Sequence, residues 1–518
     1  MAFKSILFGE TDYVPEPYPK EPEFFRDLSL DYVIEGIVKN KDKYNLKEFF
    51  FNPLHDRDTI IFRQEVLKDL EGNTELFEKV KSFAQVIFDA VSVAKRTIKV
   101  LSDSEQKNEN YLEKGRFLDS LIIYFTNIEG FEESFRKFDL KSKGLREFRE
   151  FLSSYVNSEE FKKILSDAKS LREELSKVKY SMIIKDRCIK VRPYEDEEDY
   201  TIEIEKIFEK FREGETKDYR KTFPEDPYAE HVEVGVLNLV SKLYPETFER
   251  LDNFYEKNKH FVREELARFA REVQFYIAYL EYIEKFKKMG LKFTYPNVLT
   301  DAKEIYAYES FDIALADRLW AKDKIIVCND FHLKDPERII VVTGPNQGGK
   351  TTFARMFGQL HYLASLGLEV PGTKAQLKLP DRIFTHFERE ENVETLHGKL
   401  QSDLLRMKEI LDNATKDSIV IINEFLSSTS LRDAILIGKQ ILEILTKLDC
   451  FGVWVTFIDE FSSYSEKTVS MVSTVDPADP VKRTFKIVRK PSDGLAYAIH
   501  IAEKYGLTYE TLKERIKS

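Results

Sequence analysis

Apolar positions divide the chain into a helical part and a mixed part. From Glu23 to about Gly290, apolar residues recur at helical spacing with few Gly or Pro residues between them. This pattern predicts helices over 58–70, 75–101, 110–127, 131–156 and 159–178. It also predicts one long helix from Phe248 to Met289, about 60 Å in length. Apolar residues in that helix alternate steps of four and three, which indicates a coiled-coil-like seam or a long core helix: Val262, Leu266, Phe269, Val273, Tyr276, Leu280 and Ile283.

One stretch inside the helical part is β-prone. Residues 179–192 are rich in β-branched side chains, end at Pro193 and are followed by an acidic patch at 195–199. We interpret the stretch as a small β insertion at the far end of a helical arm. Its basic residues fit a solvated face or a contact with nucleic acid. If DNA is bound, the first candidates are Lys185, Arg187, Lys190 and Arg192.

After Gly290, short β runs alternate with helices. The runs lie at 324–328, 338–343, 418–422 and 452–458 and predict an α/β domain with a mainly parallel sheet. The expected fold is therefore multidomain, with an all-α domain followed by an α/β domain. We place an extended, proline-rich lead-in at 1–22, the helical domain at 23–293 with its β insertion at about 179–200, and the α/β domain at 294–518.

Composition narrows the class of protein. The 518 residues carry a net charge of −11, which excludes a surface that is basic all over but permits a local basic stripe. No apolar run approaches the roughly 20 residues that span a bilayer. Three scattered cysteines give neither a disulfide framework nor a metal cluster. We expect a cytoplasmic protein without membrane contact.

The strongest motif follows the β run at 338–343. A Gly-x-x-x-x-Gly-Lys-Thr loop leads into an amphipathic helix, and Gly367 is placed to end that helix. Strand, glycine-rich loop and helix together predict a phosphate-binding loop for ATP, rather than a glycine-rich turn before an ordinary helix. Lys350 would reach the β- and γ-phosphates, and the Thr351 hydroxyl would bind Mg²⁺. The expected ATP-binding residues are Gly344, Pro345, Asn346, Gln347, Gly348, Gly349, Lys350, Thr351 and Thr352.

Two later strands compete to supply the carboxylate that activates water. One ends in Asn423-Glu424 and the other in Asp459-Glu460. The second has the conventional Asp-Glu pair, but it leads into a stretch that is typical of a peripheral loop. The first is followed by a polar turn that opens a helix. We therefore assign the catalytic base to Glu424.

Residues 291–518 resemble the ATPase domain of the MutS mismatch-repair family. The resemblance rests on six ordered segments: Asn329, the loop at 344–352, the Gly-x-x-Val-Pro segment at 367–371, the Asp-Arg-Ile-Phe-Thr segment at 381–385, the approach to the second acidic strand at 410–415, and the Gly-Leu-Ala segment at 494–496. The helical half is similar to the family's core and lever, mainly over 53–65. The match begins near residue 45, so we expect the N-terminal mismatch-recognition module to be absent.

Four positions depart from the family pattern. The family's Mg²⁺ aspartate falls on Asn423, and its switch histidine falls on or beside Phe457. The aromatic residue that stacks on adenine falls near Ile326, which offers only an apolar contact. The signature serine, which a partner subunit presents to the γ-phosphate, aligns with Gly398. Thr351 and Asn423 are thus the implied Mg²⁺ ligands.

The resemblance implies a homodimeric P-loop ATPase of the ABC type that uses ATP and Mg²⁺. Closure on ATP would move helical levers on duplex or branched DNA, in mismatch repair or recombination. One alternative is a nucleotide-switched clamp with little hydrolysis. Another is a chromosome-structuring ATPase, but its coiled coil would interrupt the ATPase after the phosphate loop, whereas here the helical arm comes first.

Overall fold

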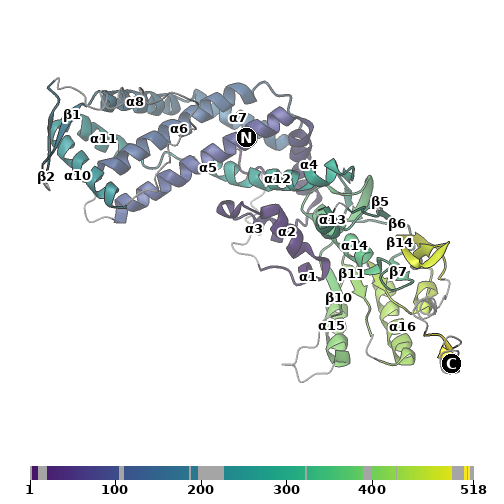
Figure 1. The fold of residues 1–518 in the computed structure, drawn as a ribbon. Coiled ribbons are helices and arrows are strands. Elements are labelled where there is room, and N and C mark those ends of the chain that lie inside the picture. The colour runs from purple at the N-terminus through teal and green to yellow at the C-terminus, as the bar shows by residue number, and fades with distance from the viewer. Residues whose placement is uncertain are drawn as a thin grey trace. The chain divides into compact units, whose positions relative to one another are not determined.

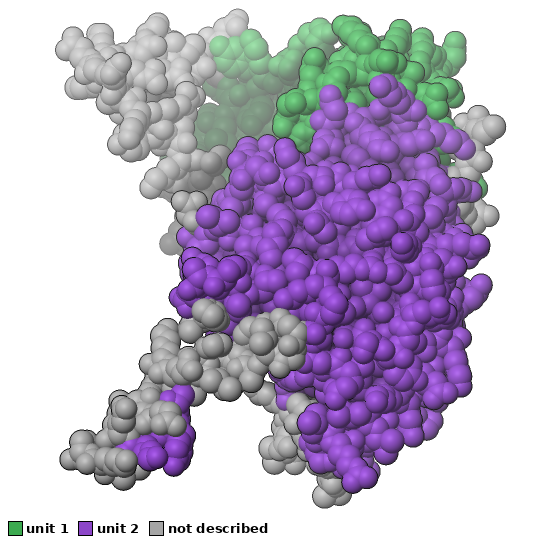
Figure 2. Space-filling model, turned by 90° about the vertical axis from the view of Figure 1, so that its right-hand side faces the viewer, with its two compact units in different colours: residues 1–5, 73–140, 145–273 green, residues 6–72, 141–144, 274–518 purple. Residues whose placement is uncertain are grey.

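The computed structural model describes residues 3–9, 20–103, 110–185, 188–195, 227–320, 322, 324–388, 399–426, 429–492, 507–509 and 512–513. The chain forms two compact units, shown in different colours in Figure 2. Unit 1 contains residues 1–5, 73–140 and 145–273, and unit 2 contains 6–72, 141–144 and 274–518. Residues 6–72 therefore pack with the α/β half of the chain. Within the described ranges, no helix combines the length and the apolarity that crossing a bilayer requires.

Unit 1 is built from antiparallel helices and one hairpin. Helices α5, α6 and α8 run side by side in Figure 1, and α11 packs against α6 and α8. Stacked rings fill its interior, with centroids 3.9 Å apart for Phe83 and Phe131 and 3.5 Å apart for Phe148 and Phe269. The elements are α5 (Thr74–Asp103), α6 (Tyr111–Phe135), α7 (Lys143–Asn157), α8 (Glu159–Ser176), β1 (Tyr180–Lys185), β2 (Cys188–Pro193), α10 (Pro227–Leu243), α11 (Pro245–Asn258) and the first part of α12 (Glu264–Lys288).

Three predicted helices are corrected by the structure. The helices expected over 110–127 and 131–156 are instead α6, which continues to Phe135, and α7, which begins at Lys143. The long helix expected from Phe248 to Met289 is interrupted at 259–263 between α11 and α12. There, Phe261 is buried against the rings of Phe117 and Tyr124, and the Tyr124 hydroxyl accepts a hydrogen bond from the Arg263 amide at 3.2 Å. These tertiary contacts turn the chain out of the helix.

Unit 2 is centred on a six-stranded sheet of order β10-β11-β12-β7-β13-β14. All neighbouring pairs are parallel except β13 and β14. Its strands are β7 (Ile339–Thr343), β10 (Ile383–Phe387), β11 (Ile419–Asn423), β12 (Phe451–Val455), β13 (Thr468–Asp476) and β14 (Asp479–Arg489). Helix α14 (Lys350–Ser365) packs on β11 and β12. Side chains of α15 (Lys399–Asn413) and α16 (Leu431–Leu448) pack with alternate residues of the same strands, such as Val420 and Ile422.

A smaller sheet and several short helices complete unit 2. The four-stranded sheet has the order β4-β9-β5-β6, and β3 pairs with β8. Residues 324–328 were predicted as a strand, but they have no regular structure, and β6 begins only at Asn329. The remaining elements are α1 (Phe24–Leu28), α2 (Leu30–Val38), η1 (Asp42–Tyr44), α3 (Lys47–Phe51), α4 (Arg57–Gly72), β3 (Phe293–Thr294), β4 (Asn297–Leu299), β5 (Ile305–Ser310), α13 (Ile313–Trp320), β6 (Asn329–Leu333), β8 (Val370–Pro371), β9 (Lys374–Lys378) and η2 (Asp459–Ser463).

A buried arginine anchors the C-terminal end of α14. Arg63 of α4 is fully buried and donates hydrogen bonds to the carbonyl oxygens of Leu7 and Leu366, each at 3.0 Å. The positive charge lies where the helix ends, which is the favourable end of the helix dipole. Gly367, expected to end the helix, has a φ of +75°, and a side chain there would meet Arg63. Residues 3–9, in the predicted lead-in, are themselves largely buried.

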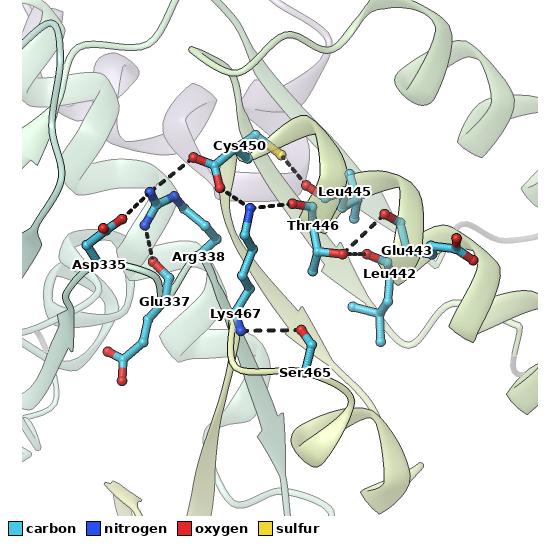
Figure 3. A network of polar contacts seen from close by, with 11 residues as sticks. Asp335, Glu337, Arg338, Leu442, Glu443, Leu445, Thr446, Cys450, Ser465 and Lys467 are labelled. Atoms are coloured by element: carbon cyan, nitrogen blue, oxygen red, sulfur yellow. Dashed lines mark hydrogen bonds and ion pairs between the residues drawn. The ribbon is translucent and has the colours of Figure 1, made fainter.

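A charged network holds the strand ends opposite the phosphate loop (Figure 3). Asp449, which follows α16, pairs with Arg338 at 3.0 Å and with Lys467, and Lys467 also donates to the Thr446 carbonyl oxygen at 2.8 Å. Burial alone would raise the pKa of Asp449, but Lys467 and Arg338 lower it below its usual value. The network ties the starts of β7 and β13 to the turn before β12.

Candidate nucleotide-binding site

The phosphate loop lies between the fully buried strand β7 and helix α14. Its backbone enters the left-handed region at Gly344 (φ +113°), Gln347 (φ +59°) and Gly349 (φ +92°). A side-chain carbon at Gly344 would lie 2.8 Å from the Ser473 carbonyl oxygen, so only glycine fits there. Gly349 caps the N-terminus of α14, where free amide groups and the helix dipole favour a phosphate.

The Lys350 ammonium is folded over the loop. Its Nζ donates to the carbonyl oxygens of Gly344 at 2.9 Å and Pro345 at 3.1 Å. The same nitrogen lies 4.6 Å from the centre of the Phe457 ring. Burial lowers the pKa of Lys350, the Glu424 carboxylate acts in the opposite direction, and Arg483 adds to the lowering. The cation is thus held in a partly desolvated place beside Glu424.

Thr351 and Asn423 meet at the carboxyl end of the sheet. The Thr351 hydroxyl donates to the Asn423 side-chain oxygen at 3.0 Å. Strand β11, which Asn423 ends, is separated from β7 by β12 alone. Both side chains offer neutral oxygen atoms, which Mg²⁺ accepts together with phosphate oxygens and water. In the part of the chain that the structure describes, no three His, Cys, Asp or Glu side chains group to hold a metal ion, so the fit depends on the phosphates.

Glu424 stands in a strained turn directly after β11. Its φ is +56°, and that of Leu426 is +66°, which is costly for residues other than glycine. The Glu424 amide donates to the Val455 carbonyl oxygen at 3.0 Å, which fixes the turn against β12. Asp459 and Glu460 instead line a cavity of about 660 Å³ with Arg489 and Lys490, and no described residue of the phosphate loop borders it.

Three side chains that the sequence did not indicate lie against the loop. The Ser473 hydroxyl donates to the Gly348 carbonyl oxygen at 2.7 Å, and Arg483 Nε donates to the Asn346 carbonyl oxygen at 3.1 Å. Phe485, with a φ of +58°, lies 3.9 Å from where a Cβ of Gly349 would be. All three come from β13 and β14, more than 120 residues after the loop, and no local motif marks them.

Asn329 holds β14 next to this loop. Its side-chain nitrogen donates to the Phe485 carbonyl oxygen at 3.1 Å, and its oxygen accepts from the Ile487 amide at 2.8 Å. Ile326 is half-buried in the irregular stretch just before β6. These contacts give a structural role to Asn329, one of the segments on which the resemblance in sequence rests.

The other candidate residues lie in unit 1 or outside the residues that the structure describes. Lys185, Lys190 and Arg192 belong to the β1–β2 hairpin of unit 1. Arg187 and Gly398 fall outside the described residues. The candidate site described here therefore consists of the loop, the ends of β11 and β12, and the β13–β14 pair.

Comparisons with known proteins find similarity in the part of the chain that contains the phosphate loop. Residues 340–516 match the family model described as MutS domain V. The DNA mismatch repair protein MutS of Chlorobium phaeovibrioides is 29% identical over 202 residues, which are 38% of this chain and 23% of that protein. The endonuclease MutS2 of Thermus thermophilus is 29% identical over 189 residues, 36% of this chain and 25% of the relative. The MutS protein of Protochlamydia amoebophila is 26% identical over 274 residues, 51% of this chain and 32% of that protein.

The match is confined to one part of each protein. The aligned region spans only about a quarter to a third of the length of these relatives. The family model covers residues 340–516, the part of the chain whose phosphate loop, sheet and strand ends have just been described. Residues 340–516 of the chain are therefore a MutS domain V, which is an ATPase domain of the ABC type.

Proposed function

We propose that this protein is a homodimeric, DNA-associated ATPase that hydrolyses ATP–Mg²⁺ and closes its helical unit on duplex or branched DNA, in mismatch repair or recombination. One observation carries the proposal: Lys350, the Thr351–Asn423 pair and Glu424 converge at the carboxyl end of one sheet. That edge of an open α/β sheet is where ligands bind.

Each residue has a distinct task in this mechanism. Loop amides and Lys350 hold the β- and γ-phosphates, and Glu424 accepts a proton from the water that attacks the γ-phosphorus. The bond from that phosphorus to the bridging oxygen breaks, and ADP and phosphate leave. Thr351 and Asn423 are the residues that would hold Mg²⁺, which neutralises charge on the phosphates when bound. In the dimer, groups around Gly398 of one subunit would complete the site of the other.

The neutral Asn423 leads to a prediction about the metal. Mg²⁺ prefers charged oxygen ligands, so an amide near it weakens the site while phosphates and Thr351 still retain the ion. We expect Asn423→Asp to lower the Mg²⁺ concentration that gives half the maximal ATPase rate, by about threefold or more on the usual scale of charged-ligand effects. A Mg²⁺ titration of phosphate release measures this midpoint.

Asp459→Asn is the matched control for the metal site. Asp459 lines the separate cavity together with Arg489. The Asp459→Asn variant should therefore leave the Mg²⁺ midpoint unchanged. An unmoved midpoint in Asn423→Asp, combined with an upward shift in Asp459→Asn, would assign the metal to the other strand.

The hairpin of unit 1 is the proposed DNA contact. Its register pairs Lys185 with Cys188, Ile183 with Lys190 and Ser181 with Arg192, so the three basic residues share one face. Residues of the opposite face, Ile189 and Val191, pack with the apolar cluster of α10 and α11. Lys185 and Lys190 are exposed, while Arg192 is half-buried. The basic face is thus turned away from the helices.

Neutralising this face should weaken DNA binding and its salt dependence. Each lost phosphate contact reduces the number of counterions that DNA binding releases. The plot of log K against log salt concentration therefore becomes less steep by about one unit of slope per lost contact. We expect the triple variant of Lys185, Lys190 and Arg192 to Gln to lose up to three units of slope, measured by gel shift or anisotropy with duplex, mismatched, branched and single-stranded DNA.

A second triple variant separates local contact from total charge. Lys162, Lys163 and Lys169 are exposed on α8, and changing them to Gln removes the same charge from another surface of unit 1. It should keep the wild-type slope. Equal slopes in all three proteins would identify the hairpin as a plain solvated face.

The alternative is a nucleotide-switched clamp with little hydrolysis. The neutral Asn423 and the Phe457 ring that covers Lys350 in place of a polar switch residue favour it. Both candidates use the same ATP site, and they differ in whether turnover continues beyond one phosphate per site.

A further inference from the structure

A buried histidine, His386, packs against the turn that carries Glu424. His386 is in β10 with only 1% of its surface exposed, and it pairs in register with Ile422, one residue before Asn423. Its ring meets the Phe425 ring edge to face, with centroids 4.9 Å apart and planes at 80°. Such an arrangement is the favourable geometry for two rings. The imidazole therefore touches the residue that follows Glu424.

The same histidine faces a buried carboxylate on another element. His386 Nε2 lies 3.6 Å from Asp403 Oδ1, and Asp403 is 8% exposed. This distance is too long for a hydrogen bond but within the range of an ion pair. Asp403 is in the second turn of α15, which begins at Lys399, directly after the predicted signature position Gly398. The contact therefore joins α15 to β10.

Phe425 is well placed to transmit this contact to Glu424. It lies between two residues with positive φ, Glu424 and Leu426, and such a backbone persists only where the surroundings hold it. Phe425 is buried, and its ring is also 6.3 Å from that of Trp454. His386 and Trp454 thus fix the Phe425 ring, and the peptide before it carries the Glu424 side chain. A shift of the imidazole would redirect that carboxylate.

We propose that His386 and Asp403 are positioning residues that align Glu424 through Phe425 and link it to α15. This proposal rests on the proposed function, in which Glu424 is the base.

The test compares steady-state ATPase kinetics of variants in the full-length chain. His386→Phe keeps a ring against Phe425 but removes the nitrogen that faces Asp403, and Asp403→Leu removes the carboxylate. For each we expect kcat to fall about tenfold, less than the roughly hundredfold or more that loss of a general base costs, while the KM for ATP stays within twofold. Because the two residues act as one unit, the double variant should be no slower than either single one. Asp403→Asn, which keeps an oxygen toward the imidazole, should retain more of the rate than Asp403→Leu.

His361→Phe is the matched control for loss of a buried histidine. His361 is fully buried in α14 and donates from Nδ1 to the Phe357 carbonyl oxygen of the same helix. Its variant should keep the wild-type kcat. If His386→Phe does not fold, the comparison of Asp403→Leu with Asp403→Asn carries the same test.

Two results would overturn the proposal. A wild-type kcat in His386→Phe would mean that the imidazole does not act on Glu424. A double variant that is slower than either single one by the product of their effects would mean that the two residues do not act as one unit. A Glu424→Gln variant in the same assay identifies which claim has failed. Wild-type turnover in Glu424→Gln rejects the base assignment and with it the positioning role. A slow Glu424→Gln beside fast His386 and Asp403 variants rejects the positioning role alone.

Discussion

A Glu424→Gln variant is expected to bind ATP as tightly as the wild-type protein and to release phosphate about a hundredfold more slowly or worse, the usual cost of losing a general base. Glutamine keeps the size of the side chain and its place in the strained turn, but it cannot accept the proton of the attacking water. ATP should therefore remain bound, and the dimer that it closes should persist. Steady-state phosphate release, nucleotide titration and sedimentation with ATP measure the three effects.

Glu460→Gln is the matched control, because it makes the same change at the other acidic strand. Glu460 is exposed and lines the separate cavity that also contains Arg489. Its variant should hydrolyse ATP at the wild-type rate and dissociate normally. If Glu460→Gln alone abolishes turnover, the catalytic strand is β12 and not β11.

Lys350→Ala is expected to weaken ATP binding tenfold or more, which corresponds to at least about 1.4 kcal/mol. The lysine supplies the point charge that reaches the β- and γ-phosphates, and its ammonium already lies over the loop at the Gly344 and Pro345 carbonyl oxygens. Equilibrium titration with a fluorescent ATP analogue measures the change.

Lys482→Ala controls for the loss of one positive charge near the same sheet. Lys482 is mostly exposed on β14 and lies 3.4 Å from Asp476. Its variant should bind ATP with wild-type affinity. An unchanged titration in Lys350→Ala would reject the phosphate-loop assignment. An equal loss of ATP affinity in both variants would mean that the loss comes from the change in net charge and not from a contact of Lys350 with the phosphates.

The elements that local pattern specifies were predicted well. The glycine spacing before Lys350 and the apolar face of residues 350–365 gave β7, the loop and α14, and the β-prone stretch at 179–192 gave the β1–β2 hairpin. In these segments backbone preference, turn residues and burial all favour the same structure. The end of α14 near Gly367 was also predictable, since positive φ favours glycine.

The features that depend on distant contacts could not be predicted. Helical spacing continues across 259–263, and only the pocket around Phe261, made by rings of α6, explains the break there. Similarly, β-branched residues at 324–328 indicated a strand, but the stretch has no regular structure in the fold. Local propensity is a weak guide where tertiary packing decides.

The candidate site shows the same division. Lys350 and Thr351 are marked by their own loop, and Asn423 and Glu424 by a strand followed by a polar turn. The contacts from Ser473, Arg483 and Phe485 arise because β13 and β14 are placed beside β7 by the order of the sheet. The spacing of residues along the sequence carries no information about such long-range contacts.

Multiple-turnover phosphate release by the full-length protein, at saturating ATP and Mg²⁺, tests the central claim most directly. If Lys350, Thr351, Asn423 and Glu424 form a working ATPase site, phosphate should accumulate linearly well beyond one equivalent per subunit, and Glu424→Gln in the same assay should stop at or below one. Release that ends at one equivalent or less in the wild-type protein, with ATP still bound, would contradict the hydrolytic function and identify a nucleotide-switched clamp instead.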